Sequence, residues 1–248
     1  MLLTQKVALI TGTATGIGET TAHLFAENGA RVFLLDRDAQ RNAAVAESIR
    51  AAGGWARSFA GDVRQASEIA PAVEAAISEF GQIDLLINNA GIYPRAAFLE
   101  MTEAQWDEMQ DINLKSMYHT HKLVMPHMVA RRSGKVVNIS SVTFHLGVAN
   151  LSHYVASKGG VIGLTRSLAR EMGEHNVYVN CITPGAIKTE AEAAVVTPEQ
   201  AKEFVAGQSL KRRLLPLDVA RVALFLCSDL SDGMTGQVLN VDGGWVMY

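Results

Sequence analysis

The feature that most constrains the fold is a regular alternation of short apolar runs with longer amphipathic segments. Seven runs have the character of strands, at residues 6–11, 31–36, 55–60, 84–88, 135–140, 177–182 and 237–241. Six helical patterns lie between them, at residues 16–28, 38–52, 65–79, 103–131, 153–173 and 218–228. Most of the runs are continuously apolar, which is typical of parallel strands covered on both faces. The alternation predicts an α/β fold: a doubly wound parallel sheet of about seven strands with helices on both faces.

The chain of 248 residues has the length of one large α/β domain. It shows no repeat, low-complexity tract or linker, so we expect a single domain over residues 1–248. Only residues 183–217 break the alternation, and a short helical pattern lies within them near 198–207. A long segment of this kind late in an α/β domain is typical of a lid. We therefore expect a substrate lid at about 190–210, with an ordinary surface excursion as the alternative.

Composition excludes several classes of function. A hydrophobic fraction of 48% and a net charge of −3 do not fit a basic nucleic-acid binder or a disordered acidic tail. No apolar stretch reaches eighteen residues, and the N-terminus lacks a basic region and a cleavage site, so neither a membrane span nor a signal peptide is predicted. Cys181 and Cys227 lie in apolar runs and are expected to be buried free thiols. No cluster has metal-ligand spacing. We expect a cytoplasmic protein without a metal site.

A glycine-rich stretch, TGTATGIG at residues 11–18, follows the first predicted strand and opens the first predicted helix. Gly12, Gly16 and Gly18 give the spacing G-x-x-x-G-x-G, which differs from the G-x-G-x-x-G of many dinucleotide sites. Glycines here permit a positive φ and let the backbone approach a pyrophosphate bound at the helix N-terminus. The stretch indicates a dinucleotide site, although a plain strand–helix turn could have the same composition.

Acidic and turn-forming residues follow the next three predicted strands. Asp36 ends the second strand, where a carboxylate accepts hydrogen bonds from the adenosine ribose and repels a 2′-phosphate. This favours NAD over NADP, whereas the adjacent Arg37 could bind a 2′-phosphate and Asp36 could instead cap the next helix. Asp62 and Val63 follow the third strand, and NNAG at 88–91 ends the fourth. Ligands bind at the carboxyl ends of parallel strands, so we expect Asp62 to reach the adenine amino group and the NNAG backbone to pass beside adenine and ribose. Turn chemistry is the alternative.

Two Tyr-x-x-x-Lys pairs occur in the chain, Tyr118 with Lys122 and Tyr154 with Lys158. Residues four apart share one face of a helix. A phenol has a pKa near ~10, too high for a general base at neutral pH, but a neighbouring ammonium stabilises the phenolate and lowers that pKa. On this ground alone, either pair could transfer a proton.

The chain resembles the short-chain dehydrogenase/reductase family in a set of motifs that runs from about residue 6 to the C-terminal VDGGW. The motifs are TGTATGIG, Asp62, NNAG, Asn113, Ser141, Tyr154, Lys158 and PG at 184–185. The resemblance implies a Rossmann-like NAD(P)-dependent oxidoreductase. In the family the catalytic serine precedes the tyrosine by about thirteen residues. Ser141 precedes Tyr154 by thirteen, whereas Gln105 stands at that distance before Tyr118. Tyr118 and Lys122 are then expected to serve helix packing and solvation.

The resemblance implies a catalytic set of Asn113, Ser141, Tyr154 and Lys158. Tyr154 would be the general acid/base, and Ser141 would orient the substrate oxygen, with Ser140 as the alternative. Lys158 would lower the pKa of Tyr154 and hold the nicotinamide ribose. Asn113 would anchor a water that links Lys158 to solvent.

The segment PGAIKT at 184–189 matches the family segment at the nicotinamide end of the cofactor. By this resemblance the Ile187 backbone and the Thr189 hydroxyl would contact the carboxamide. The predicted cofactor-binding residues are Gly12, Thr15, Gly16, Ile17, Gly18, Asp36, Asp62, Val63, Asn89, Ala90, Gly91, Tyr154, Lys158, Pro184, Gly185, Ile187 and Thr189.

The predicted substrate-facing side chains are mostly aromatic: Tyr93, Ser141, Phe144, His153 and Tyr154. The stretches NNAGIYP and HYVASK resemble those of bacterial aryl-alcohol (1-phenylethanol-type) dehydrogenases of the family. We therefore expect NAD-dependent interconversion of an apolar or aromatic secondary alcohol and its ketone. The alternatives are a sugar or polyol dehydrogenase, a 3-oxoacyl reductase, or an NAD(P)-binding sensor or scaffold without turnover. Family members are commonly tetrameric, which implies a homotetramer with residues 245–248 at or near a subunit contact.

Overall fold

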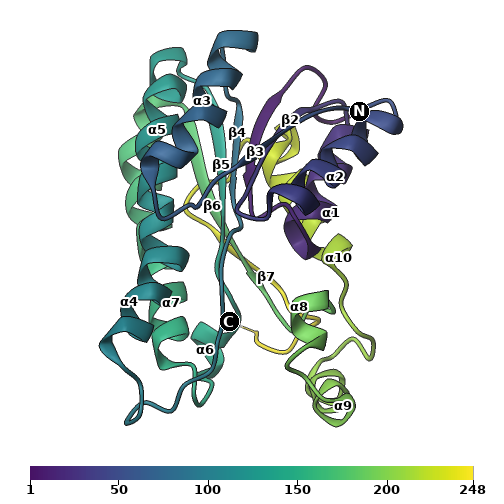
Figure 1. The fold of residues 1–248 in the computed structure, drawn as a ribbon, viewed down its shortest axis with the longest axis vertical. Coiled ribbons are helices and arrows are strands. Elements are labelled where there is room, and N and C mark those ends of the chain that lie inside the picture. The colour runs from purple at the N-terminus through teal and green to yellow at the C-terminus, as the bar shows by residue number, and fades with distance from the viewer. Residues whose placement is uncertain (248) are drawn as a thin grey trace.

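Seven parallel strands form one sheet in the computed structural model, which describes residues 1–247 (Figure 1). The strands are β1 (Val7–Thr11), β2 (Arg31–Asp36), β3 (Trp55–Ala60), β4 (Leu85–Asn88), β5 (Gly134–Ile139), β6 (Val177–Pro184) and β7 (Val238–Val241). Their order is β3-β2-β1-β4-β5-β6-β7, so the direction of winding reverses between β1 and β4. The predicted doubly wound parallel sheet is confirmed, and each strand lies within two residues of its predicted bounds at either end.

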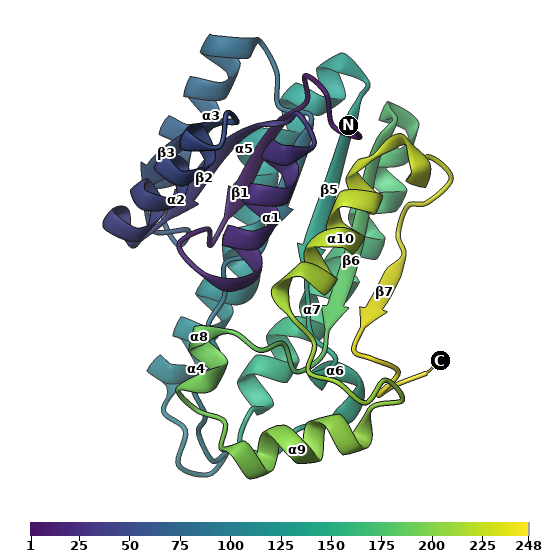
Figure 2. The same ribbon diagram turned by 90° about the vertical axis from the view of Figure 1, so that its right-hand side faces the viewer.

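Helices cover both faces of the sheet, as predicted. On one face lie α1 (Gly16–Glu27), α2 (Ala39–Ala51) and α10 (Pro216–Cys227), and on the other α3 (Ala66–Phe80), α5 (Ser116–Arg131) and α7 (Ser152–Met172) (Figures 1 and 2). A separate apolar core fills each face. Alternate residues of β1 serve the two cores: Ala8 and Ile10 point to one, Val7 and Leu9 to the other. No helix within residues 1–247 is long and apolar enough to cross a membrane.

The helix predicted over residues 103–131 is interrupted, which corrects the sequence analysis. It consists of α4 (Glu103–Gln110), a π-helical segment (Asp111–Lys115) and α5. Thr102 begins it with a capping box, in which its side chain accepts a hydrogen bond from the Gln105 N–H. A single π-helical turn inside a helix is frequent at functional sites. Here the π turn carries Asn113, which is fully buried.

The segment after β6 holds two helices, α8 (Glu190–Ala193) and α9 (Pro198–Gly207), capped by Thr189 and Thr197. Both lie beyond the C-terminal ends of the strands, on the opposite side of that end of the molecule from α4 (Figures 1 and 2). Neither contains a buried residue. Helix α10 begins at Pro216, so Asp218 lies in its first turn, where its carboxylate accepts a hydrogen bond from the Leu215 N–H.

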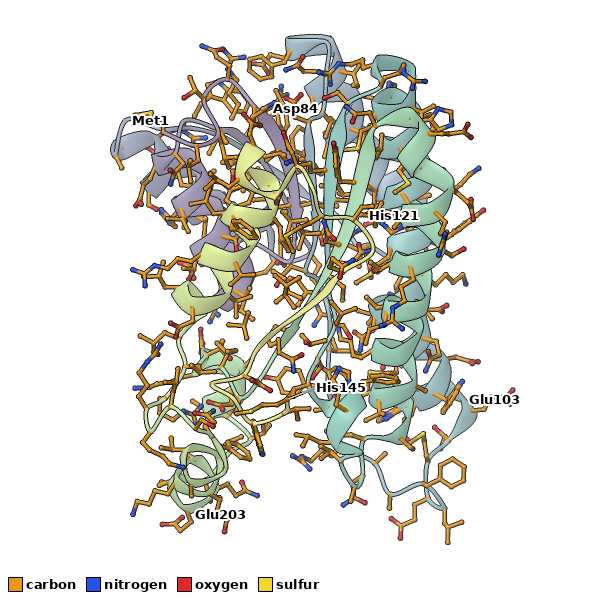
Figure 3. All side chains as sticks on the ribbon, turned by 180° about the vertical axis from the view of Figure 1, so that it is seen from behind. Met1, Asp84, Glu103, His121, His145 and Glu203 are labelled. Carbon is orange, nitrogen blue, oxygen red and sulfur yellow. The ribbon has the colours of Figure 1, made fainter. Side chains whose placement is uncertain are left out.

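Short helical elements complete the chain between the main ones. They are α6 (Thr143–Leu146) after β5, and two 3-10 turns at Gly173–His175 and Asp229–Ser231. Among the residues that Figure 3 labels, Asp84 lies at the N-terminal ends of the strands, and His145 of α6 lies near the opposite end of the molecule. Helices α4, α6, α8 and α9 lie around the C-terminal ends of the strands, the end at which parallel α/β sheets bind ligands (Figures 1 and 2).

Candidate active site

The glycine loop between β1 and α1 packs against the end of β4. Gly12 has a φ of +71°, and a Cβ there would lie 2.8 Å from the Ala90 Cα. A Cβ at Gly18 would lie 1.9 Å from the Gly12 carbonyl oxygen, so neither position tolerates a side chain. Thr15 is the N-cap of α1 and its side chain makes no capping hydrogen bond. The loop therefore presents backbone N–H groups at a helix N-terminus, which suits a phosphate group.

A pocket with about 490 Å³ of empty volume lies at the C-terminal ends of β3, β2, β1 and β4, next to the point where the winding of the sheet reverses. It is lined by Gly12, Leu35, Asp36, Arg37, Gly61, Asp62, Val63, Ala90, Gly91, Ile92 and Ile112. The structure thus brings together predicted cofactor residues from the ends of four strands. A glycine loop, a carboxylate at the end of β2 and a crevice at the switch point together fit the adenosine half of a dinucleotide.

The two acidic residues of this pocket have different surroundings. Asp36 accepts hydrogen bonds from the N–H groups of Ala14 (3.0 Å) and Asp38 (2.9 Å), which fix its carboxylate at the rim. The cap of α2 is Asp38, not Asp36, because the Asp38 side chain accepts from the Arg41 N–H. Asp62 is bound by Arg64 through Nε (2.8 Å) and Nη2 (2.5 Å), and these hydrogen bonds lower its pKa.

In the NNAG segment, the Asn89 side chain holds the glycine loop and the residues after it line the pocket. The Asn89 amide donates to the carbonyls of Thr11 (3.0 Å) and Gly12 (2.9 Å), so this side chain holds the glycine loop. Thr11 Oγ1 in turn accepts from the N–H groups of Asn89 and Ala90, both at 3.1 Å. Ala90 and Gly91 line the pocket, whereas Asn89 does not. The sequence analysis did not predict this role of Thr11. The sequence signal for it is its position at the end of a strand, directly before a glycine loop.

Asn113 fastens the next residue of this segment to the π turn. Its Oδ1 accepts from the Ile92 N–H and its Nδ2 donates to the Ile92 carbonyl, both at 2.8 Å. Nδ2 also lies 3.3 Å from Ser157 Oγ on α7. A Cβ on Gly91 would lie 3.1 Å from Asn113 Oδ1 and 3.5 Å from Lys158 Nζ. The π turn, the pocket and Lys158 therefore meet at Gly91.

Ser141, Tyr154 and Lys158 lie together beside this point. Lys158 is buried, donates to the Ile139 carbonyl (2.9 Å), and places Nζ 5.6 Å from the centroid of the Tyr154 ring. Desolvation raises the pKa of Tyr154 to about 12, and a hydrogen bond with Ser141 opposes that shift. Desolvation also lowers the pKa of Lys158 to about 8. Ser140 donates to the Lys158 carbonyl (2.7 Å), so its hydroxyl is engaged with α7 rather than with the tyrosine.

The second Tyr-x-x-x-Lys pair lies in a different environment. Tyr118 is 56% exposed on α5, and its ring contacts His119. Lys122 is exposed. This pair is solvated, whereas Lys158 is desolvated beside the pocket, and only in a water-poor environment do charge and hydrogen bonding shift a phenol pKa strongly.

The predicted substrate-facing residues differ in burial and in the side chains that they contact. The ring of Tyr93 meets that of Tyr154 edge to face at a centroid distance of 6.2 Å. Desolvation raises the pKa of Tyr93, a hydrogen bond with Thr189 lowers it, and the charge of Glu192 raises it. The Phe144 ring packs on α7 at Gly159, where a Cβ would lie 2.8 Å from it. His153 is buried at the start of α7, and burial lowers its pKa.

The segment predicted to meet the nicotinamide end runs from the end of β6 into α8. Pro184 belongs to β6, and a Cβ on Gly185 would lie 2.8 Å from the Asp242 Cα. Ile187 is buried in the core beside α1 and α10, so only its backbone is available to a ligand. Thr189 lies next to the glycine loop, because a Cβ on Gly16 would lie 3.3 Å from its methyl carbon.

Comparisons with known proteins agree with this geometry. A family model described as Enoyl-(Acyl carrier protein) reductase matches residues 12–246. The chain is 38% identical over 248 residues to the 3-oxoacyl-[acyl-carrier-protein] reductase FabG of Thermotoga maritima, covering 100% of both chains. It is 37% identical over 246 residues to the D-xylose 1-dehydrogenase of Caulobacter vibrioides strain NA1000, covering 98% of this chain and 96% of that one.

A solved structure is also similar over nearly the whole chain. It is a 7α-hydroxysteroid dehydrogenase complexed with NADH and 7-oxo glycochenodeoxycholic acid, with a TM-score of 0.95 and 35% identity, covering 99% of this chain and 96% of that one. These relatives are named as a reductase and as dehydrogenases, and their names give different substrates. The sheet order, the switch-point pocket and the matched lengths establish that this chain belongs to the short-chain dehydrogenase/reductase family of oxidoreductases.

Proposed function

We propose that this protein is an NAD-dependent dehydrogenase that interconverts a secondary alcohol and its ketone, with Tyr154 as the general acid/base. The observation that carries the proposal is the meeting of Ser141, Tyr154 and Lys158 beside Gly91 of the dinucleotide pocket. A proton-transfer group within reach of a dinucleotide site is what hydride-transfer chemistry requires. The sensor or scaffold alternative needs no such grouping.

Alcohol oxidation needs a proton acceptor for the hydroxyl group. The cofactor, when bound, would supply a positively charged oxidised nicotinamide ring, which becomes neutral on taking the hydride from the carbinol carbon. Tyr154 takes the proton of the substrate hydroxyl as phenolate, and Ser141 donates a hydrogen bond to the substrate oxygen. Lys158 has a pKa of about 8, so it is mostly protonated at neutral pH, and its ammonium favours the phenolate against the desolvation that raises the pKa of Tyr154. In ketone reduction Tyr154 returns the proton to the oxygen.

The choice of NAD rests on Asp36. Its carboxylate is held at the rim of the pocket by two backbone N–H groups, where it can accept hydrogen bonds from ribose hydroxyls and repel a 2′-phosphate. Arg64, the nearest cation to Asp62, is bound to that carboxylate, which leaves Arg37 as the pocket-lining arginine that could favour NADP. The free thiols Cys181 and Cys227 are buried, which suits a reducing cytoplasm.

For the substrate we propose an apolar or aromatic secondary alcohol or ketone. Tyr93 contributes an aromatic wall next to Tyr154, and Phe204 of α9 packs against Trp245 in a tilted arrangement near the same end of the molecule. The resemblance to FabG favours a second candidate, a 3-oxoacyl thioester, whose acyl chain is also apolar. A sugar substrate would need several hydrogen-bonding side chains around the carbinol, whereas the rings of Tyr93 and Tyr154 provide an aromatic wall there.

A substrate screen tests the proposal. NADH absorbance at 340 nm is followed with 1-phenylethanol-type alcohols, a pentose, a hexose and a 3-hydroxyacyl thioester, each with NAD and with NADP. We expect the highest kcat/KM with NAD and an aryl or alkyl secondary alcohol. A clear preference for a sugar would refute the substrate class, and binding of NADH without turnover of any member would favour the sensor reading.

A further inference from the structure

Helices α8 and α9 of the lid bury no residue, whereas the end of the lid is anchored by the buried Gln208 and by a hydrogen bond from the Leu210 N–H to the Gly243 carbonyl (2.9 Å). Two of its attachments reach the neighbouring C-terminal part of the chain. Glu192 forms an ion pair with Arg213, whose guanidinium lies 5.9 Å from the centroid of Phe204, and Phe204 packs against Trp245 at 5.5 Å. Both attachments join the lid to the C-terminal part of the chain, so they can persist while the lid moves together with that part.

A different attachment joins the lid to the opposite side of the sheet. Arg41 Nη1 and Nη2 donate to the two carboxylate oxygens of Glu190 at 3.0 and 3.2 Å, a bidentate pair between residues 149 apart in the sequence. Arg41 lies in the first turn of α2, after β2, and Glu190 opens α8, after β6. Strands β1, β4 and β5 stand between β2 and β6, so the chain after β6 must cross the C-terminal ends of these central strands to bring Glu190 to Arg41 (Figure 2).

The glycine loop lies next to this ion pair. Thr189, directly before Glu190, contacts Gly16, and Glu19 in the first turn of α1 is one of the carboxylates that raise the pKa of Arg41, after Glu190 and Asp38. Figures 1 and 2 both show α8 next to the start of α1. Asp36, which lines the dinucleotide pocket, comes five residues before Arg41. A dinucleotide that extends from Asp36 to Tyr154 must therefore pass beneath residues 189–190.

We propose that Arg41 and Glu190 form a clasp that closes the lid over the cofactor and limits the rate at which the dinucleotide leaves. The proposal rests on the dinucleotide site of the proposed function. The side chains are 52% and 68% exposed, so the pair can open and close without disturbing a core. The bidentate geometry fixes how the Arg41 guanidinium and the Glu190 carboxylate meet, and the exposure of both side chains makes the ion pair sensitive to salt.

Stopped-flow fluorescence of bound NADH, chased with excess NAD, tests the clasp through the dissociation rate rather than through turnover. Glu190→Gln and Arg41→Gln should each raise that rate about 1.5- to 5-fold, the range for exposed ion pairs. The double variant should match the singles, because each single change already removes the pair. Glu47→Gln is the matched control: it removes a carboxylate from an exposed ion pair with Arg50 on the same helix α2 and should leave the rate unchanged.

The outcomes separate the clasp from other roles. The rate for the wild-type protein should also rise from about 0.05 to about 0.5 M salt, and the rate for Glu190→Gln should rise less. If Arg41→Gln accelerates NADH release while Glu190→Gln slows it, Arg41 binds a cofactor phosphate and the clasp is refuted. Additive effects in the double variant, or no change in either single variant, refute it as well. A wild-type protein that does not bind NADH would instead refute the dinucleotide site itself.

Discussion

At the scale of single residues, desolvation and charge act against each other at Tyr154. Burial raises the pKa of its phenol to about 12 and lowers that of Lys158 to about 8, so each group in isolation is less able to carry charge. A phenolate at Tyr154 would be stabilised by the Lys158 ammonium, whose Nζ lies 5.6 Å from the ring centroid, and it would stabilise that ammonium in turn. Tyr118 lacks such a partner environment because it is exposed.

Replacement of each tyrosine separates the two pairs. Tyr154→Phe removes the hydroxyl that transfers the proton and should lower kcat by at least ~10²-fold, the usual scale of general acid–base catalysis. NADH affinity, measured by fluorescence titration, should barely change. Tyr118→Phe is the matched control and should keep kcat within a few-fold. An inactive Tyr118 variant beside an active Tyr154 variant would reverse the assignment.

Cofactor choice is also a property of one residue. Asp36→Ala removes a ribose acceptor and a negative charge that repels a 2′-phosphate, so it should weaken NAD binding and relax discrimination against NADP. The ratio of kcat/KM for the two cofactors measures the change. Asp38→Ala, which removes the cap of α2 but not the pocket carboxylate, is the control. A wild-type preference for NADP would assign the specificity to Arg37 instead.

At the scale of elements, α5 is joined to the sheet through a buried polar network. Asn88 of β4 donates to Asn138 of β5 at 2.9 Å, and both contact His121 of α5 through its Nε2, at 3.1 and 3.2 Å. Figure 3 shows His121 midway along the molecule, far from His145. Burial of the imidazole disfavours its protonated form, and the hydrogen bond with Asn138 offsets this only in part.

This network makes the fold sensitive to acid. Burial lowers the pKa of His121 from 6.5 to about 4, so between these values the unfolded chain binds a proton that the folded chain does not. Its contribution to stability is full above pH 6.5 and is lost as the pH falls towards about 4. Urea unfolding between about pH 7.5 and about pH 4.5 covers the range in which histidines titrate. Over this range the free energy of unfolding should fall less for His121→Asn than for the wild type. His127→Gln, an exposed position on α5, should decline like the wild type.

The lid is the element in which motion is expected. Helices α8 and α9 bury no residue, so their backbone hydrogen bonds should open more readily than those of the sheet. Hydrogen exchange over residues 190–210 should be fast without ligand and slow down when NADH and a substrate analogue are both bound. Equal protection in both states would support a rigid surface segment.

The same segment should also sense substrate size. Among the apolar side chains of the lid, Val195 is 54% exposed and Phe204 packs against Trp245. Phe204→Ala should raise KM more for bulky apolar substrates than for small ones, because the lost contact scales with buried apolar area. A uniform rise in KM would contradict a contact with the substrate.

At the scale of the whole molecule, we predict a homotetramer built on the long helices over residues 103–131 and 153–173. Trp245 packs on α9, where a Cβ on Gly207 would lie 3.0 Å from its Nε1, and Met247 is 76% exposed. Tyr248, the last residue of the predicted contact, lies outside the described residues. Light scattering at micromolar concentration should give four times the mass of one chain. A mass equal to that of a single chain would exclude this assembly.

The sequence by itself determined the sheet, its helices and the nature of the cofactor loop. Continuous apolar runs mark parallel strands because both faces of each strand are covered, and this information is local. Gly12 and Gly18 can likewise be recognised in the sequence from their spacing after an apolar run. The structure gives the reason for them, because the surrounding backbone leaves no room for a side chain at either position. The position of Asp36 follows from the end of a strand. In the same way, the spacing of Ser141, Tyr154 and Lys158 depends on one strand, one loop and one helix.

Tertiary structure alone decided how polar side chains are partnered. Asn89 holds the glycine loop, and Asp62 is bound by Arg64. Asn113 is hydrogen-bonded to Ile92 from a π turn that the sequence pattern did not predict. Arg41 meets Glu190 only because β2 and β6 bring their following segments to the same end of the sheet. The physical reason is range: burial of an apolar run is satisfied by any suitable cover, whereas a hydrogen bond or ion pair needs a particular partner at about 3 Å, which the path of the whole chain must supply.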